Sequence, residues 1–439
     1  MVQPLSISRA LVALLATVAM RPAVAVESGS VDSAATDAVP SAPIKEGDSI
    51  DFGQLQRIQN YLPQPFWDNR EYFFFEGMNL EVGEFYRDYG PTEARKEVTK
   101  RFKGTARIGR DGALENYSLG RPFPEIADDD PQKGVKHAWN MSYRHDALEG
   151  RASWFFTYWD NGDLLPLWYK GTGWGMRLSR RTDLADTNGE FFDQEKRMGA
   201  GGITVKEPHD ARGIIGLGYR YKSADAPRDE ARGTDIWVYI PSLRRVRRIS
   251  SGSRTDRISG TDMTAEDQGG FSGIITHFTW EHLGETELLA PIDSRLRGYP
   301  HSDSENFGPL GFSLANDVWQ LRKVMILEQR PKDDQHPYER KRLWVDKQTY
   351  NILYAAAYDR KDELWKLMYK ASRWTESEHQ DKKIDGQELR AFLPVCNVLV
   401  NPITGTGVRI EAFDVRPTRL SRGKIRRQID IGRLSRQGR

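Results

Sequence analysis

From residue 99 onward, the chain repeats short runs of aromatic and β-branched residues, the composition typical of β-strands. Glycine, proline, asparagine and aspartate separate these runs. Two of the connections, at residues 346–349 and 359–362, are only four residues long. Such short connections favour antiparallel strands over parallel strands with crossover helices. The chain is therefore predicted to be mainly β. The predicted strands span residues 153–159, 213–221, 235–240, 273–280, 318–327, 342–345, 352–358 and 364–369.

Two segments before residue 99 show helical patterns. Residues 49–62 carry Phe52, Leu55 and Ile58 at a spacing of three residues. Residues 80–89 end at the pair Gly90-Pro91, which stops helices. We predict one helix in each range.

The first 25 residues have the three parts of a secretory signal peptide. Arg9 supplies a positive charge, residues 10–20 are apolar, and residues 23–25 form a small-residue cleavage site. A transmembrane anchor needs a longer apolar run. We therefore expect export to the periplasm, with cleavage near Ala25.

The rest of the chain is predicted to contain one large domain. Residues 26–48 are rich in Ser, Ala, Asp and Pro, which predicts a disordered leader. The domain then spans residues 49–415, followed by a basic tail at residues 416–439. The single cysteine, Cys396, cannot form an internal disulfide.

Charge is distributed unevenly. The 439 residues carry a net charge of +2, but residues 416–439 hold nine Lys or Arg and one acid, Asp430. Subtracting this local excess of +8 from the total leaves −6 for the remainder. The simpler interpretation is a solvated or partly ordered end, and the other is a contact with anionic lipid headgroups. Export argues against a nucleic-acid partner.

The strand predicted at residues 235–240 is apolar on both faces, because aliphatic and aromatic side chains alternate along it. These side chains are Ile236, Trp237, Val238, Tyr239 and Ile240. Such a strand needs protein on each face or a hydrophobic ligand against one of them. With export and without catalytic motifs, we favour the wall of a cavity.

An arginine cluster follows this strand. Arg244, Arg245, Arg247 and Arg248 can bind carboxylates or phosphates, or can form a charged rim that discourages edge-to-edge aggregation. We favour a structural or docking role, with a membrane or a transporter as the partner.

Large aromatic side chains concentrate in residues 154–159 and 164–174. They either pack together across a wide sheet or line an apolar cavity. Later in the chain, Trp365, Leu367 and Tyr369 are predicted to share one face, with Leu364, Lys366, Met368 and Lys370 on the other. This aromatic face is expected to look into a core or a cavity.

Motifs for catalysis are absent from the sequence: there is no HExxH, GxSxG, P-loop or CxxC. The glycine-rich residues 171–175 and 213–218 lack the setting of a phosphate cradle and are interpreted as bends or bulges. His277 and His282 would lie on opposite faces of a strand, and the acidic residues 128–130 are interpreted as a turn rather than a Ca²⁺ loop. We predict no enzyme, metal or cofactor.

One acidic pair lies close to several arginines in the sequence. Glu266 and Asp267 precede the glycines at residues 269–270 and are placed to pair with nearby arginines.

The order of several motifs between about residues 50 and 425 resembles one family, called domain of unknown function 1329. The stretch 237–241 with the arginines at 244–248 is the first of these motifs. Others are residues 116–124, 139–140, 271–273, 278–287, 322–328, 338–346, 357–359 and 363–365.

The resemblance implies an exported protein similar in fold to the periplasmic lipoprotein carriers of the Lol pathway. That fold is an incompletely closed antiparallel β-barrel with a helical lid over an apolar cavity. Members often accompany resistance-nodulation-division-type exporters, so an inner-membrane exporter or an outer-membrane component is the implied partner. No catalytic residue is carried over.

We therefore predict a periplasmic carrier or binding protein for a lipid or another hydrophobic molecule. The alternative is an accessory subunit that carries nothing and docks a transporter or envelope complex. The third class, a hydrolase or lyase, has no motif in its favour. The candidate cavity residues are Trp237, Tyr239, Trp280, Tyr354, Trp365 and Tyr369.

Overall fold

The computed structural model describes residues 43–144, 149–182, 184, 189–190, 196–249, 254–296, 307–376, 390–418 and 420–437. The predicted signal peptide and most of the predicted leader lie outside these ranges. Residues 43–48, assigned to the leader, form a turn in which Ile44 is buried and Gly47 N–H donates to Val82 O at 2.8 Å. No helix in the described part of the chain has the length and apolar character that a membrane span requires.

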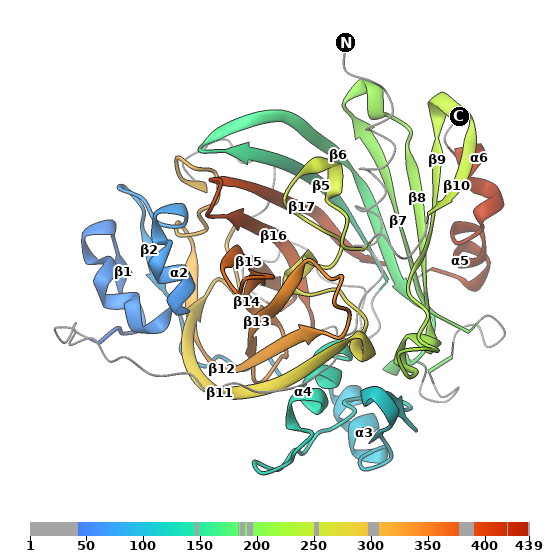
Figure 1. Cartoon of the computed structure of the whole chain (residues 1–439), viewed down its shortest axis with the longest axis horizontal. Helices are drawn as coiled ribbons and strands as arrows, with labels where there is room; N and C mark the ends of the chain where they lie inside the picture. The colour runs from blue at the N-terminus through green and yellow to red at the C-terminus, as the bar shows by residue number, and fades with distance from the viewer. Residues whose placement is uncertain are drawn as a thin grey trace.

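One large, strongly curved sheet forms the body of the protein, and it does not close (Figure 1). Its strands run in the order β1-β2-β12-β13-β14-β15-β16-β17-β5-β6-β7-β8-β9-β10, and β11 pairs with β12. All pairs are antiparallel except β2 with β12. The N-terminal strands are β1 (Ser49–Ile50) and β2 (Leu80–Val82). The middle strands are β5 (Glu149–Asp160), β6 (Asp163–Arg177), β7 (Arg197–Glu207), β8 (Ile215–Tyr221), β9 (Asp235–Ile240) and β10 (Arg245–Ile249). The last strands are β11 (Phe278–Ala290), β12 (Val318–Pro331), β13 (Tyr338–Asp346), β14 (Ile352–Asp359), β15 (Leu364–Trp374), β16 (Phe392–Asn401) and β17 (Thr406–Thr418).

Short helices and a small ribbon surround the sheet. The ribbon pairs β3 (Arg107–Ile108) with β4 (Leu114–Glu115). The α-helices are α2 (Gln64–Asp68), α3 (Glu93–Arg101), α4 (Lys133–Ser142), α5 (Arg422–Gln428) and α6 (Leu434–Gln437). The longest 3₁₀ helix is η2 (Phe52–Tyr61). The shorter ones are η3 (Arg70–Tyr72), η4 (Arg110–Gly112), η7 (His209–Ala211), η8 (Lys222–Asp225), η9 (Pro241–Leu243), η11 (Ile258–Gly260), η12 (Gln268–Gly270), η13 (Ile275–His277) and η15 (Ile431–Arg433).

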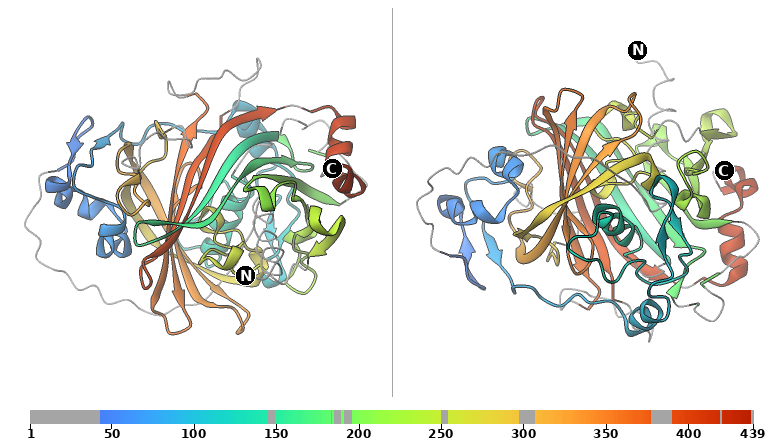
Figure 2. Two further views of the ribbon diagram at one scale, coloured as in Figure 1. Left: turned by 90° about the horizontal axis from the view of Figure 1, so that it is seen from above. Right: turned by 60° about the horizontal axis from the view of Figure 1, so that its bottom comes forward.

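Three apolar clusters hold these elements together. The first lies on one face of the sheet, under α4 and residues 254–277. The second lies on the other face, where the N-terminal helices pack on β12, β14, β15 and β16. The third joins α5 and α6 to β7, β8 and β9. Figures 1 and 2 show the N-terminal helices and the C-terminal helices at opposite ends of the molecule.

The predicted mainly β, incompletely closed fold is confirmed. Most predicted strands fall inside longer observed ones, and β9 matches its predicted range. The strand predicted at 273–280 begins only at Phe278, because η13 occupies Ile275–His277. β6, β7, β16 and β17 were not individually predicted.

Of the two predicted helices, the first is present as a 3₁₀ helix and the second is wrong. Residues 49–62 contain η2, a 3₁₀ helix capped by the Asp51 side chain, which accepts from Gln54 N–H at 2.9 Å. Residues 80–89 instead begin with β2, whose Leu80 and Val82 are fully buried on either side of Glu81. β2 lies so close to β12 that a Cβ on Gly83 would stand 2.6 Å from Val318 Cγ1. Pairing in the sheet therefore outweighs the helical pattern.

The C-terminal tail belongs to the fold. Its predicted boundary at residue 416 falls inside β17, and the helices after it bury Ile425, Ile429 and Leu434. These side chains pack on Tyr219 and Tyr239. The tail is therefore not a solvated end over residues 420–434.

Candidate functional site

A partly enclosed cavity in the described part of the chain has a volume of about 440 Å³. It lies against β5, β6, β7, β15, β16 and β17, with residues 268–272 forming another part of its wall. Apolar side chains make up much of the lining: Trp154, Trp174, Met176, Met198, Ile203, Phe392, Leu393 and Ile410. A cavity of this size and character falls in the range of small-molecule sites, about 300–1,000 Å³.

Glycines in β6 and β7 create the space for two indole rings beside this cavity. A Cβ on Gly171 would stand 2.6 Å from Cζ2 of Trp154, and one on Gly202 would stand 2.7 Å from Cε2 of Trp174. The ladder also shifts register between Lys170 and Gly171, so the predicted bulge in this glycine-rich run is confirmed. The glycines therefore let large rings lie flat on neighbouring backbone.

The charged residues of the lining are all cationic: Arg144, Arg151, Arg177, Arg220 and Lys370. No Asp or Glu belongs to the described lining. Arg144 donates from Nε to Asn351 Oδ1 at 3.1 Å and from Nη1 to Met141 O at 2.7 Å. Burial, followed by the charge of Arg177, lowers the pKa of Arg144 to about 9. With a pKa of about 9 the Arg144 guanidinium stays protonated near neutral pH, so it contributes positive charge to the described lining.

Arg220 is the most deeply buried of these cations, with 5% of its surface exposed. Its Nη2 atom has no hydrogen-bond partner in the described structure. Burial is the largest cause that lowers the pKa of Arg220 to about 9, and the charge of Arg177 adds to it. Two other arginines, in contrast, have acidic partners. Arg180 pairs with Asp225, and Arg181 Nη1 lies 2.7 Å from Glu149 Oε1.

The six predicted cavity residues lie elsewhere, and none of them lines this cavity. Trp237 and Tyr239 face the C-terminal helices, and Trp280 packs edge-on against Phe271 at 5.4 Å. Tyr354 and Tyr369 stack on each other with centroids 6.2 Å apart. The remaining candidate, Trp365, lies 5.5 Å from the ring of Tyr338.

Different parts of the protein pack on the two faces of β9. Ile236, Val238 and Ile240 belong to the cluster under α4, whereas Trp237 and Tyr239 pack with α5 and α6. Protein therefore covers both faces of this strand.

The prediction that Trp365 shares a face with Leu367 and Tyr369 is wrong. Leu367 and Tyr369 belong to the N-terminal cluster, but Trp365 packs against the cluster on the opposite face. The cause is a bulge in the β14–β15 ladder, where the register shifts between Ala357 and Tyr358. One extra residue reverses the direction of every side chain before it.

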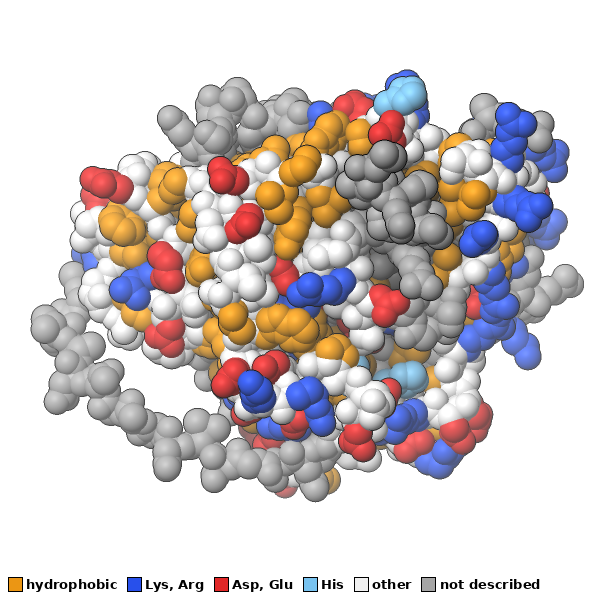
Figure 3. Space-filling view, turned by 45° about the horizontal axis from the view of Figure 1, so that its top comes forward, with side chains coloured by type: hydrophobic (Ala, Val, Ile, Leu, Met, Phe, Trp, Pro, Cys, Tyr) orange, Lys and Arg blue, Asp and Glu red, His pale blue; other side chains and the backbone are white. Residues whose placement is uncertain are grey.

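The arginine cluster lies on the edge strand β10 and in the turn before it. Arg245 and Arg247 are exposed, and Arg244 adopts a left-handed conformation with φ 47°. Arg248 is also exposed and donates to Asp235 at 2.7 Å. Figure 3 shows Lys and Arg side chains gathered on the side of the molecule where β10, α5 and α6 lie. We call Arg244, Arg245, Arg247, Arg422, Lys424, Arg426 and Arg427, all exposed, the basic face.

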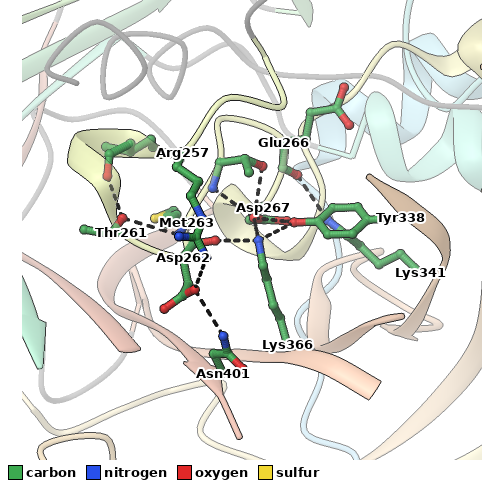
Figure 4. Close-up of polar contacts among 12 residues, drawn as sticks. Arg257, Thr261, Asp262, Met263, Glu266, Asp267, Tyr338, Lys341, Lys366 and Asn401 are labelled. Carbon is green, nitrogen blue, oxygen red and sulfur yellow. Dashed lines mark hydrogen bonds and ion pairs between the residues drawn. The ribbon is translucent and has the colours of Figure 1, made fainter. Parts of the chain in front are cut away.

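A buried ionic network holds residues 254–277 on the sheet (Figure 4). Asp267 accepts from Lys341 Nζ at 2.8 Å and from Tyr338 Oη at 2.8 Å, and Lys366 Nζ lies 3.3 Å away. Although burial by itself raises the pKa of Asp267, the charges of Lys341 and Lys366 bring it well below its usual range. Asp262 accepts from Arg257 at 2.9 Å. The groups are mutually paired, so we assign them a structural role.

The sequence anticipated part of this network. Glu266 lies 3.8 Å from Arg254 Nε, which confirms the predicted pairing of that acid with an arginine. Asp267 pairs instead with two lysines from β13 and β15. Only the sheet register brings these strands together, so local sequence could not reveal them.

The residues considered as metal ligands have other contacts. Asp128 and Asp130 pair with Lys133 and Lys136, and His282 stacks on His137 at 5.3 Å. No cluster of three or more His, Cys, Asp or Glu with metal-binding geometry occurs among the described residues.

The chain is similar to several known proteins. An uncharacterized protein of Pseudomonas aeruginosa is 22% identical over 304 residues, and the match spans 66% of this chain and 61% of that protein's length. A putative outer membrane lipoprotein-sorting protein domain from Vibrio parahaemolyticus is 20% identical, with a TM-score of 0.45 over 69% of this chain and 99% of that one. A LolA superfamily protein from Nitrosomonas europaea is 14% identical, with a TM-score of 0.35 over 64% and 90%. No function follows from likenesses with TM-scores below 0.5.

The family assignment has stronger support. A family model described as protein of unknown function (DUF1329) matches residues 73–390, which is most of the chain. A DUF1329 family protein from Desulfovibrio piger is 20% identical, with a TM-score of 0.44 over 68% of this chain and 96% of that one. The matched range includes the ionic network and much of the cavity lining. The chain therefore belongs to the DUF1329 family of proteins of unknown function.

Proposed function

We propose that the protein is a periplasmic carrier or binding protein for a lipid or another hydrophobic molecule. The observation that carries this proposal is the cavity of about 440 Å³, with Trp154, Trp174 and Met198 in its lining. Apolar ligand surface moved from water into this cavity contributes about 25 cal/mol per Å². The export pattern in the first 25 residues supports the periplasm as the place of action.

The binding is reversible and needs no chemistry from the protein. Gln268, Gly269 and Ser272 line the cavity and belong to the segment that Asp267 fixes to the sheet. This part of the wall therefore stays in place while a ligand enters and leaves. Rigid aromatic walls lose little conformational entropy when a ligand binds.

The basic face is proposed to bring the carrier to an anionic membrane. Its arginines come from two distant parts of the chain, β10 and α5, and are exposed. Each cation near an anionic leaflet contributes about 1 kcal/mol of attraction. This surface also supports the alternative of an accessory subunit that docks an envelope complex.

Organic extraction of the purified protein, followed by mass spectrometry, tests the carrier against the accessory subunit. The carrier is expected to release a co-purifying hydrophobic molecule at near-stoichiometric amounts, and native mass spectrometry is expected to show the same mass on the intact protein. A protein that emerges empty and binds no fluorescent fatty-acid probe would contradict the carrier and favour the accessory subunit.

A further inference from the structure

The described lining of the cavity combines apolar walls with cationic side chains. Five cationic residues and no described acid line it, although ion pairs are frequent immediately outside it. Desolvating a charge is costly unless an opposite charge compensates for it. A cavity that took only neutral hydrophobic molecules would gain nothing from these arginines.

Two buried hydrogen-bond donors of the lining have no acceptor. Among the described lining residues, the buried side-chain atoms without a partner are Nη2 of Arg220 and the indole Nε1 of Trp154. Both atoms donate and neither accepts. Buried donors are nearly always satisfied in folded proteins, so the buried charge of Arg220 is only partly compensated within the described structure.

Three of the arginines act on a common region. Arg177 and Arg220 pair with Gly199 from its two sides in the β6–β7–β8 ladder, and both line the cavity with Arg144. Arg177 itself is half-buried, and its guanidinium carbon lies 5.4 Å from the ring centre of Tyr143. Guanidinium groups recognise carboxylates and phosphates with two parallel hydrogen bonds.

We propose that the cavity selects an anionic amphiphile, whose carboxylate or phosphate head lies against Arg177 and Arg220 while its tail covers the apolar lining. This inference rests on the proposed carrier function and narrows its ligand class. The head supplies an acceptor for the guanidinium groups of Arg177 and Arg220, and its charge offsets the repulsion among the arginines. Neutral and cationic amphiphiles with the same tail bind more weakly.

Four probes with the same dodecyl tail test the proposal by calorimetric titration of the purified protein below their micelle concentrations. They are dodecanoate, dodecyl phosphate, dodecyl maltoside and dodecyltrimethylammonium. The two anions are expected to bind at least about tenfold more tightly than the maltoside, and the cation most weakly. The stronger of the two anions distinguishes a fatty-acid head from a phospholipid-type head.

The variant Arg220→Met tests whether the Arg220 guanidinium is responsible for the preference for anions. It keeps an unbranched side chain and removes a buried charge that has no hydrogen-bond partner at Nη2, so it is expected to fold. Affinity for both anions should fall about tenfold, with affinity for the maltoside unchanged. Arg177→Met, at a half-buried position, should act in the same direction. Arg101→Met, at an exposed position on α3 outside the cavity lining and the basic face, is the matched control and should change nothing.

The possible failures are distinct. If all four probes bind equally and Arg220→Met affects them equally, the selection of anions is wrong while the carrier stands. If no probe binds, the proposed carrier function itself fails.

Discussion

The carboxylate of Asp267 lies 2.8 Å from the ammonium group of Lys341, and these side chains are 0% and 1% exposed. A second ammonium group, that of Lys366, lies 3.3 Å from the same carboxylate. Strands β13 and β15 and the segment 254–277 thus meet at one buried charge cluster. The cluster fixes a wall of the cavity, so it links the stability of the fold to the proposed site.

Asp267→Asn is expected to destabilise the protein by about 3–5 kcal/mol, because it leaves two buried lysines without their shared counter-charge. Urea unfolding followed by tryptophan fluorescence measures the change. Asp334→Asn removes an exposed carboxylate from the nearby β12–β13 turn and should change stability by no more than about 0.5 kcal/mol. Equal effects of the two variants would show that the network does not hold this segment.

The carboxylate of Asp267 also predicts that the protein loses stability in acid. Its pKa is lower in the folded protein than its ordinary 3.8, so the unfolded chain takes up the proton first as pH falls. Stability from Asp267 is therefore complete above about pH 4 and is lost below it. In Asp267→Asn this part of the acid dependence should disappear.

A second pH effect comes from His137, which stacks on His282 at 5.3 Å. Burial, and then the charge of His282, lowers the pKa of His137 from 6.5 to about 3. The unfolded chain thus binds this proton first, and stability falls by at most about 1.4 kcal/mol per pH unit from this group below pH 6.5. Unfolding measured from pH 7.5 to 5 should give a shallower slope for His137→Gln.

His209→Gln is the control for this slope, because the His209 side chain is 93% exposed. Its slope should match that of the unmodified protein. A slope that His137→Gln leaves unchanged would contradict the buried neutral state of that ring.

The strand patterns could be read from the sequence wherever turns are short. β14 and β15 lie at their predicted places because residues 359–362 form a tight connection between them. The bulge that turns Trp365 to the other face left no sequence signal. β2 was missed because two or three alternating residues do not distinguish a strand from a helix.

The cavity was harder to predict than the fold. The aromatic run 154–159 was open to two interpretations, a filled sheet or a cavity lining. Trp154 does line the cavity. Trp154 pairs with Gly171 across the β5–β6 ladder. A glycine-rich run that follows an aromatic run was therefore the sequence signal that could have indicated the cavity. Arg177 and Arg220 come from separate strands, and no local pattern links them.

The docking of the C-terminal helices is tested by Ile425→Ala. Ile425 is fully buried against the outer face of β8 and β9, so its truncation should destabilise the protein by about 2–5 kcal/mol. Lys424→Ala, at the exposed neighbouring position, should have little effect. If urea midpoints of the two variants coincide, the tail is not docked in solution.

The basic face predicts binding to vesicles of phosphatidylglycerol and phosphatidylcholine in equal parts. The double variant Arg245→Glu with Arg247→Glu reverses two exposed charges and should weaken vesicle binding at least about tenfold in sedimentation assays. A matched reversal, Lys100→Glu with Arg101→Glu, lies at exposed positions on α3, away from this face (Figure 1). If both reversals weaken binding equally, net charge rather than the basic face attracts the membrane.

Titration with a fluorescent fatty-acid probe tests the central claim most directly, when the protein is compared with Gly173→Leu. Gly173 lines the cavity, and a Cβ there meets Trp154 only at an ordinary 3.6 Å, so leucine fills the cavity without forcing the sheet apart. The neighbouring Thr172 is not a lining residue, which makes Thr172→Leu the matched control. We predict saturable binding to the unmodified protein and to Thr172→Leu, with at least about tenfold weaker binding to Gly173→Leu. Equal binding by all three proteins, or by none, would contradict a hydrophobic ligand in this cavity.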